Sequence, residues 1–248
     1  METVAIIPAR FASTRLPGKP LADICGKPMI VRVAERASMV KGIDRVVVAT
    51  DSHRILNEVN GYGFHGVITS EQHPSGTDRI YEAARKLELS GDCIIVNIQG
   101  DQPLFEPKAV EAMVNLLKDG RFPMTTVACP MSIEEAQDPN RVKVVLDRFG
   151  KAVYFSRSLI PFDRDGLLKG KARPYLRHLG LYCYRVDFLK DFVSWPTGTL
   201  ENIEKLEQLR VLENGGSIGV VVVSDAPPEV DTKEDLEKIR RLFDADMA

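Results

Sequence analysis

The sequence is poor in the residues that build metal clusters and disulfide frameworks. Its 248 residues include only four cysteines, four histidines and one tryptophan. The cysteines lie far apart and form no Cys-x-x-Cys pair, which argues against a zinc site or a disulfide framework and favours reduced thiols. Two of them, Cys93 and Cys129, lie in apolar runs, so we expect their thiols to be buried and inert.

The sequence also lacks an excess of either charge and any long apolar run. Its 33 lysines and arginines nearly balance 35 aspartates and glutamates, for a formal net charge of -2. This balance argues against a surface that coats nucleic acid, so any anion binding must be local. No apolar run approaches the length of a membrane span, and the first one is too short for a signal peptide. We therefore expect a soluble, cytoplasmic protein with no nucleic-acid partner and no membrane insertion.

What the sequence does contain, through its first half, is an alternation of short apolar runs and amphipathic segments. Apolar residues recur at helical spacing over residues 29–40, 80–87 and 110–117. We expect strands at Val4–Pro8, Arg45–Thr50, Val67–Thr69, Cys93–Gln99 and Thr125–Cys129. Strands that alternate with helices predict an α/β fold in which a mostly parallel sheet is flanked by helices.

After about residue 140 the pattern changes to one that favours antiparallel strands. Val142–Asp147 and Lys151–Phe155 flank a turn and predict a hairpin, and Leu176–Arg185 predicts another strand. We expect an exposed loop at Ile160–Pro174, helices at Leu200–Glu213 and Lys233–Phe243, and a strand at Ser217–Val223. One α/β domain with a mixed β insertion accounts for both halves.

Three cations follow the first predicted strand within a loop shaped by glycine and proline. Arg10, Arg15 and Lys19 lie where ligands bind in open α/β sheets, beyond the carboxyl end of a strand. Such a loop can neutralise a nucleoside triphosphate and its departing pyrophosphate. It matches neither the GxxxxGK[ST] loop nor GxGxxG, which excludes the ordinary kinase and dinucleotide sites. The alternative is that the three cations are only solvated loop residues.

Two aspartates are candidate magnesium ligands. Asp101 follows an apolar strand, and a carboxylate at this edge of a sheet can hold magnesium together with phosphate oxygens. Asp231 is a candidate second ligand. The alternatives are that Asp101 only closes a turn, and that Asp231 supports a helix cap formed by Thr232 and Asp235.

Two further groups of polar residues have a functional and a structural interpretation. Ser75 and Gly76 precede a predicted helix and can bind a base or ribose, or an N-cap can form at Ser75 or Thr77. Arg157 and His178 can hold the carboxylate and hydroxyls of an acidic sugar, although a lone histidine more often makes a structural hydrogen bond. Glu207 and Gln208 interrupt a mostly apolar helical pattern, and Glu207 can instead pair with an arginine such as Arg210.

The order of these motifs carries a resemblance that spans nearly the whole chain. The motifs are IIPARFASTRLPGKPL at 6–21, GKPMIVRVAERA at 26–37, VVVATD at 46–51, SGTDR at 75–79, NIQGDQP at 97–103, VKVVLD at 142–147, YFSR at 154–157, RHLGLYCYR at 177–185, LEQLR at 206–210 and VDTKEDLE at 230–237. In this order they resemble the 3-deoxy-manno-octulosonate (Kdo) cytidylyltransferase family, also called CMP-Kdo synthetase. The resemblance implies a Rossmann-like sugar-nucleotidyltransferase fold, a homodimer and the cofactor Mg²⁺.

The resemblance also implies a role for each matching residue. CTP would be bound by Ala9, Arg10, Arg15, Lys19, Ser75, Gly76 and Gln99, and the sugar by Gln102, Arg157, His178, Glu207 and Gln208. Asp101 and Asp231 would hold the metal and, with Lys19, carry catalysis. The single domain 1–248 would have a nucleotide-binding part at about 1–130, a sugar-binding and dimerisation part at about 131–215, and a C-terminal strand and helix at 216–248 that return to the nucleotide part.

The reaction implied is transfer of CMP from CTP to the anomeric 2-hydroxyl of a 3-deoxy-ulosonic acid, with release of pyrophosphate. The sugar would be Kdo or its 8-amino analogue, activated for lipopolysaccharide synthesis. The chain departs from the family at Gln102, where glutamate is usual, and this change can alter which sugar is accepted. The alternatives are another CMP-sugar synthetase, such as a CMP-sialate synthetase, or a nucleotide-binding module without catalysis.

Overall fold

The computed structural model describes residues 1–12 and 16–247, and the chain divides into two compact units. Unit 1 comprises Met1–Glu111, Arg185–Leu189 and Pro227–Ala248, and unit 2 comprises Ala112–Tyr184 and Lys190–Ala226. These bounds differ from the expected parts. Residues 112–130 and the strand near 220 belong to unit 2, because that strand hydrogen-bonds to a neighbour within it, whereas the last helix belongs to unit 1.

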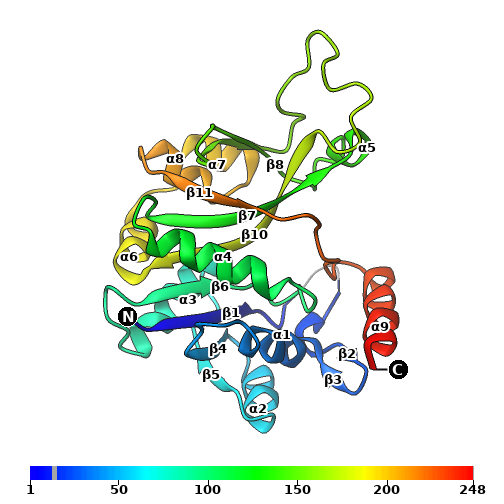
Figure 1. The fold of residues 1–248 in the computed structure, drawn as a ribbon. Coiled ribbons are helices and arrows are strands. Elements are labelled where there is room, and N and C mark those ends of the chain that lie inside the picture. The colour runs from blue at the N-terminus through cyan, green and yellow to red at the C-terminus, as the bar shows by residue number, and fades with distance from the viewer. Residues whose placement is uncertain (13–15, 248) are drawn as a thin grey trace. The chain divides into compact units, whose positions relative to one another are not determined.

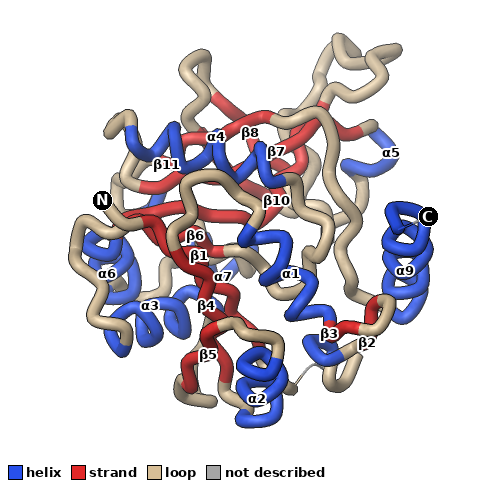
Figure 2. The backbone as a smooth tube through the Cα atoms, turned by 60° about the horizontal axis from the view of Figure 1, so that its bottom comes forward, coloured by secondary structure: helices blue, strands red, loops and turns tan. Residues whose placement is uncertain are grey.

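Unit 1 is built on four parallel strands in the order β6 (Ile94–Asn97), β1 (Thr3–Ala9), β4 (Arg45–Thr50) and β5 (His65–Ile68). Helices α1 (Met29–Ser38) and α3 (Gly76–Lys86) both contact β1 and β4, and they lie on opposite faces of these strands (Figures 1 and 2). Helix α2 (His53–Gly61) packs beside β5. Covered on both faces, the strands need apolar side chains on both faces, which explains their continuous apolar runs.

The last helix, α9 (Lys233–Met247), closes a second apolar cluster of unit 1. Its buried members are Leu16, Ile24, Met29, Val230, Leu236 and Ile239. The helix packs near the two-stranded β2 (Asp23–Ile24) and β3 (Lys27–Pro28). Its start is capped as the structural alternative predicted: the Asp235 amide donates to Thr232 Oγ1 at 3.2 Å, and Asp235 Oδ2 accepts from the Thr232 amide at 3.0 Å.

Unit 2 contains the mixed β portion. Strands β11 (Ile218–Val222) and β7 (Met124–Met131) are parallel, whereas β10 (Tyr175–Arg185) runs antiparallel to β7. Strands β8 (Lys143–Leu146) and β9 (Ala152–Ser156) form the predicted hairpin, and β8 pairs with β10 at Lys143. The expected fold class, a mostly parallel α/β fold with a mixed β insertion, is confirmed.

The predicted helix Leu200–Glu213 is wrong in one respect, because two short helices replace it. Helix α7 (Thr199–Glu204) ends where Lys205 adopts a left-handed conformation, with φ 54°, and α8 (Leu209–Glu213) begins after Gln208. A non-glycine residue in that region stops a helix. The apolar pattern is shared between the two helices, which is why it resembled one.

Several elements of the structure were not predicted from the sequence. These are α2, the two short strands β2 and β3, α5 (Ile133–Ala136) and α6 (Val186–Ser194), whereas α4 (Pro107–Lys118) matches an expected helix.

The four cysteines are free thiols, and burial raises the pKa of Cys93 to about 11, as expected for an inert thiol. Within the described residues, no helix has both the length and the apolar character to cross a bilayer.

Candidate active site

A pocket of about 330 Å³ lies at the carboxyl ends of β1 and β6, inside unit 1. Six of the predicted site residues line it: Ala9, Arg10, Lys19, Gln99, Asp101 and Asp231. They come from three segments far apart in the sequence. Gly100 lets two of these segments meet, because a Cβ at this position would lie 3.0 Å from the carbonyl oxygen of Pro8. The pocket therefore places the predicted cations and carboxylates together.

Lys19 joins the two predicted metal-binding aspartates. Its Nζ lies 2.8 Å from Asp101 Oδ2 and 3.2 Å from Asp231 Oδ1. Gly18, with φ 70°, takes a left-handed turn before the short 3₁₀ helix that begins with Lys19. Asp101 and Asp231 thus direct an oxygen toward one shared cationic position.

The surroundings of the two aspartates are those of a binding site open to solvent. Their side chains are 36% and 43% exposed, whereas the Lys19 side chain is 13% exposed. The described residues contain no group of three or more histidine, cysteine or carboxylate side chains suited to a metal. Two carboxylates leave most of a cation's coordination to other oxygens, which fits magnesium that also binds phosphate and water.

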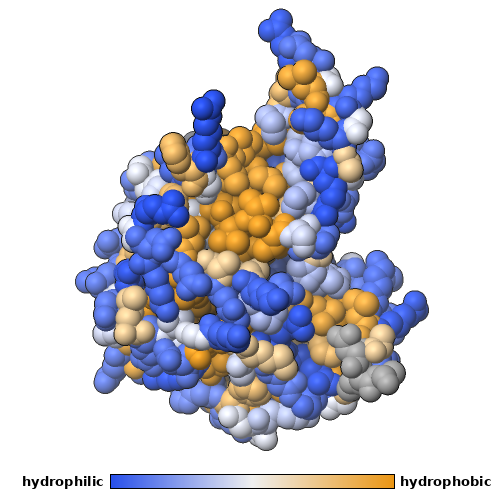
Figure 3. Space-filling model, in the orientation of Figure 1, coloured by the Kyte–Doolittle hydropathy of each residue, from blue (hydrophilic) through white to orange (hydrophobic). Residues whose placement is uncertain are grey.

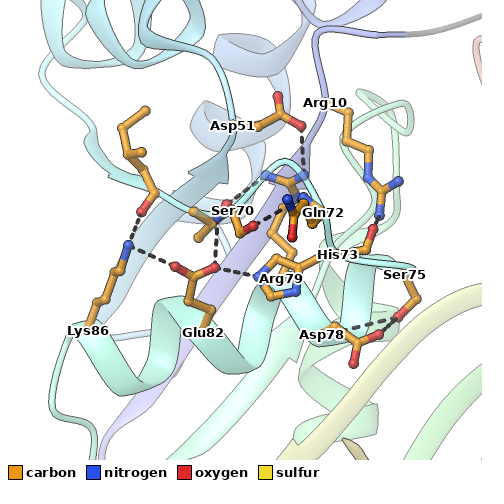
Figure 4. Close-up of polar contacts among 12 residues, drawn as sticks. Arg10, Asp51, Ser70, Gln72, His73, Ser75, Asp78, Arg79, Glu82 and Lys86 are labelled. Atoms are coloured by element: carbon orange, nitrogen blue, oxygen red, sulfur yellow. Dashed lines mark hydrogen bonds and ion pairs between the residues drawn. The ribbon is translucent and has the colours of Figure 1, made fainter.

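Arg10 is held at the edge of the pocket by the segment between β5 and α3. Its Nη2 donates to the carbonyl oxygen of His73 at 2.6 Å (Figure 4). Arg15, the remaining predicted cation of this loop, lies outside the described residues. Two of the three predicted phosphate-binding cations are thus placed at one pocket.

A buried ion pair behind the pocket supports the loop that carries Arg10. Arg79 is fully buried, and its guanidinium donates to Asp51 Oδ2 at 2.7 Å and to Thr69 Oγ1 at 2.6 Å (Figure 4). The other oxygen of Asp51 accepts from the backbone amide of Phe11, directly after Arg10. Burial lowers the pKa of Arg79, and the facing carboxylate opposes this effect.

Asp51 and Arg79 both lie in motifs of the sequence, but neither residue was assigned a role from it. Asp51 directly follows β4, at the same sheet edge as the other site residues, and Arg79 ends the SGTDR motif. Asp51 belongs to the positions that the strand-end rule selects. The burial of Arg79 follows from packing, which the sequence alone does not display.

Glu82 organises the same segment from helix α3. Burial alone would raise the pKa of Glu82, but hydrogen bonds from Lys86, the Ser70 amide and His73 outweigh it and lower the pKa to about 2 (Figure 4). The Ser70 amide donates to Glu82 Oε2 at 2.8 Å, and Lys86 Nζ lies 2.8 Å from Oε1. A carboxylate that stays ionised fixes the segment whose carbonyl holds Arg10.

Ser75 and Gly76, predicted to contact the nucleotide, open helix α3 and do not line the pocket. Ser75 is the N-cap, and its Oγ accepts from the Asp78 amide at 3.2 Å, so the capping alternative is confirmed. Gly76 lies near the pocket residue Pro8, since a Cβ there would be 3.5 Å from Pro8 Cγ. Their contact with a base or ribose stays a prediction.

Gln102 is nearly fully buried, at 4% exposure, and does not line the pocket. Its Nε2 donates to Glu229 Oε1 at 3.0 Å, within unit 1. Gln102 therefore has a carboxylate partner of its own. Its contact with the sugar stays a prediction.

In unit 2, His178 is the centre of a buried hydrogen-bond chain. Its Nε2 lies 2.9 Å from Thr126 Oγ1, whose proton goes to the Leu181 carbonyl oxygen, so Nε2 is the donor. Its Nδ1 then accepts from Gln208 Nε2 at 3.5 Å, and Tyr182 donates to the Gln208 oxygen at 3.1 Å. Burial, aided by the charge of Arg177, lowers the pKa of His178 to about 3. His178 is therefore neutral near pH 7, and the structural hydrogen bond is confirmed.

Arg157 holds backbone carbonyls at the break between α7 and α8. Its guanidinium donates to the carbonyl oxygens of Glu204 at 2.7 Å, Pro139 at 3.0 Å and Lys205 at 3.4 Å. The contacts with Glu204 and Lys205 satisfy the end of α7, where carbonyl groups lack helical partners. A contact with a sugar carboxylate stays a prediction.

Arg210, suggested as a partner for Glu207, has a buried carboxylate partner in Glu201. Arg210 binds Glu201 through both ends of its guanidinium, at 2.7 and 2.6 Å, and both residues are buried. This pair joins α7 to α8. Glu207 lies in the turn between the helices, and Gln208 is the N-cap of α8. The helix break therefore places Glu207, Gln208 and His178 in the same region of unit 2.

Comparisons with known proteins identify the family of the chain. A family model described as cytidylyltransferase matches residues 4–221. A 3-deoxy-manno-octulosonate cytidylyltransferase from Aliivibrio fischeri (strain MJ11) is 50% identical over 250 residues, covering 98% of this chain and 99% of the relative. One from Syntrophobacter fumaroxidans is 51% identical over 241 residues, covering 96% of each.

One solved structure supports the same assignment, and a second shows the same fold. A CMP:2-keto-3-deoxy-manno-octonic acid synthetase, solved in complex with CTP, has a TM-score of 0.93 and 42% identity, covering 99% of this chain and 100% of that one. A cytidylyltransferase from Leptospira borgpetersenii, at 19% identity and a TM-score of 0.64, shares the fold. The chain belongs to the 3-deoxy-manno-octulosonate cytidylyltransferase family.

Proposed function

We propose that this protein transfers CMP from CTP to the anomeric 2-hydroxyl of Kdo and releases pyrophosphate. The family assignment supports the reaction, and the observation that carries it is the pocket where Lys19, Asp101 and Asp231 meet. The attacking oxygen forms a bond to the α-phosphorus and loses its proton to water. The bond from that phosphorus to the bridging oxygen breaks, and this oxygen leaves with the pyrophosphate. Such transfers need positioning and charge stabilisation more than covalent participation by the protein.

The donor set supports a Mg²⁺ cofactor on Asp101 and Asp231. Their oxygens already face one cationic group, the Lys19 ammonium, which shows that both point toward one position. When bound, a divalent cation neutralises and polarises phosphate oxygens. The remaining coordination would come from phosphate and water.

Lys19 and Arg10 are proposed to neutralise the triphosphate. Both line the pocket, and charge grows on the leaving pyrophosphate as its bond to the α-phosphate breaks. Lys19 would exchange part of its contact with the two aspartates for contact with phosphate. Ala9, Gln99, Ser75 and Gly76 are proposed to surround the nucleotide from the ends of β1 and β6 and the start of α3.

The sugar side is proposed to lie in unit 2, at Arg157, His178, Glu207 and Gln208. Because His178 is neutral, it offers no charge to the sugar carboxylate. Arg157 is the cation proposed for that carboxylate. Whether Kdo or its 8-amino analogue is preferred depends on contacts with the sugar itself.

A substrate panel tests the proposal. Pyrophosphate release is measured with CTP and Mg²⁺ against Kdo, 8-amino Kdo and sialic acid, and with ATP, GTP and UTP in place of CTP. We expect release with CTP and a 3-deoxy-octulosonate only. Turnover of sialic acid would favour a CMP-sialate synthetase, and tight CTP binding with no release for any sugar would favour a binding module.

We also propose that the protein is a cytoplasmic homodimer that activates the sugar for lipopolysaccharide synthesis. Support for the dimer comes from exposed apolar side chains of unit 2, such as Phe149, Val153 and Phe162. Figure 3 shows apolar surface over the β8 and β11 region of this unit. Sedimentation equilibrium of the full chain should give the mass of two chains, and Val153→Glu should shift the equilibrium toward one.

A further inference from the structure

We propose that Gln102 and Glu229 form a positioning pair that fixes the separation of the Asp101 and Asp231 carboxylates. This inference rests on the cation-binding role proposed for these two aspartates. Gln102 follows Asp101 directly, and Glu229 precedes Asp231 by two positions. Their side chains meet at 3.0 Å although the residues are 127 positions apart in the sequence. The contact therefore links the two segments right beside the site.

A backbone hydrogen bond lies next to this contact. The Val230 amide donates to the Asp101 carbonyl oxygen at 3.0 Å, so residue 101 is bonded to 230 and residue 102 to 229. Val230 is fully buried in the apolar cluster beneath α9. These two hydrogen bonds, one between backbone groups and one between side chains, join residues 101–102 to residues 229–230 in antiparallel order. We call this link the clamp, and Val230 anchors it in the core of unit 1.

The clamp links two aspartates whose separation is not set by the chain around them. Asp101 follows β6 and Asp231 precedes α9, so nothing in the local chain sets the distance between them. A small divalent cation requires its ligands at nearly ideal positions. Lys19 holds both carboxylates, yet the same ammonium is proposed to meet phosphate. A link outside the carboxylates keeps their spacing independent of Lys19.

The chemistry of the pair explains why position 102 carries an amide. The Gln102 amide donates to the Glu229 carboxylate, a charge-assisted bond with an almost fully buried donor residue. A glutamate at position 102 would here face Glu229 as a second carboxylate and repel it. The Gln102–Glu229 pair therefore contains one carboxylate, whereas Gln102→Glu would place two carboxylates side by side.

A reciprocal exchange tests the pair. Four variants are compared with the wild-type protein: Gln102→Ala, Gln102→Glu, Glu229→Gln and the double variant Q102E/E229Q, which reverses the amide and the carboxylate. Glu58→Gln, an exposed carboxylate on α2, is the matched control. The probe is Mn²⁺, whose dissociation constant from the protein saturated with CTP is measured by electron paramagnetic resonance. Thermal unfolding verifies that each variant is folded.

We expect Gln102→Ala and Gln102→Glu to weaken Mn²⁺ binding by about tenfold or more, as typical for partners behind metal ligands. Q102E/E229Q should recover the wild-type constant, Glu229→Gln should fall between, and Glu58→Gln should match the wild type. If Gln102→Ala fails to fold, the comparison of Q102E with Q102E/E229Q still decides.

Three results would overturn the inference. Unchanged Mn²⁺ affinity in Gln102→Ala together with a raised KM for Kdo would make Gln102 a sugar contact. A double variant that binds Mn²⁺ as poorly as Gln102→Glu would show that the contact does not set the spacing. If the wild-type protein with CTP bound no Mn²⁺ at all, the proposed cation site itself would fail, and the inference with it.

Discussion

Single residues of this protein have to satisfy structural and chemical demands at once. Asp101 accepts a hydrogen bond from Lys19 through its side chain, and its carbonyl oxygen accepts from the Val230 amide. Only the side chain enters the proposed chemistry. A substitution that removes the carboxylate therefore leaves the backbone contact in place.

Asp101→Ala should lower turnover by about a hundredfold to a thousandfold, a loss typical for a group that stabilises developing charge. The fold should persist, because the side chain is partly exposed and Lys19 keeps Asp231 as its partner. Pyrophosphate release from CTP and Kdo checks the first point and thermal unfolding the second. Asp119→Ala, which removes an exposed aspartate, is the control, and near-normal release in Asp101→Ala would refute the assignment.

His178 should make folding depend on pH. Its pKa is about 3 in the folded protein against 6.5 when solvated, so the unfolded chain binds the extra proton between these values. The stability that neutral His178 provides is complete above about pH 6.5 and declines as pH falls toward about 3, by up to about 1.4 kcal/mol per pH unit. Urea unfolding of the wild type and His178→Gln across this range should show the steeper slope in the wild type. Parallel curves would contradict the burial of the ring.

Much of the pocket could be predicted at the residue scale. Residues after parallel strands meet at one sheet edge, and this rule selected Arg10, Lys19 and Asp101, whereas Asp231 was selected by the family resemblance. Gln102 illustrates the limit. Its side chain turns into the protein toward Glu229, a partner that only folding brings near and that the sequence did not indicate.

At the scale of elements, the clearest difference from expectation is the break in the predicted helix 200–213. Periodicity indicates which residues could face the core, yet α8 buries Leu209 and Val211 whereas the buried residue of α7 is Glu201. The break depends on Lys205 and on the Arg157 guanidinium that holds the adjoining carbonyls. Neither a lysine nor a distant arginine marks a helix end in the sequence.

The Glu201–Arg210 pair should hold the two halves of this broken helix together. Arg210→Met leaves the buried Glu201 charge without its bidentate partner and should cost about 3–5 kcal/mol of unfolding free energy. Replacing both residues with methionine should cost less than the single change, because no lone charge stays buried. Urea denaturation of the three proteins measures both effects. A single-variant loss below about 1 kcal/mol would show that the pair is not stabilising.

At the scale of the whole chain, the sequence predicted the class of each half but not the division between them. The strand 218–222 was expected to accompany the last helix, yet it pairs with β7 in unit 2 while α9 returns to unit 1. Strand pairing is decided by partners far away in the sequence. Local periodicity indicates that a strand exists and leaves its neighbours open.

The Lys19 contact has a consequence for how the pocket treats its ligand. Among residues 1–12 and 16–247, the titratable side chains that line it are Arg10, Lys19, Asp101 and Asp231, and the formal charges of these four cancel. A triphosphate, with about four negative charges, meets little net attraction from these four groups alone. A divalent cation would make the balance positive. Nucleotide binding would then depend on the cation, so the pocket would bind the complex of cation and nucleotide in preference to free nucleotide.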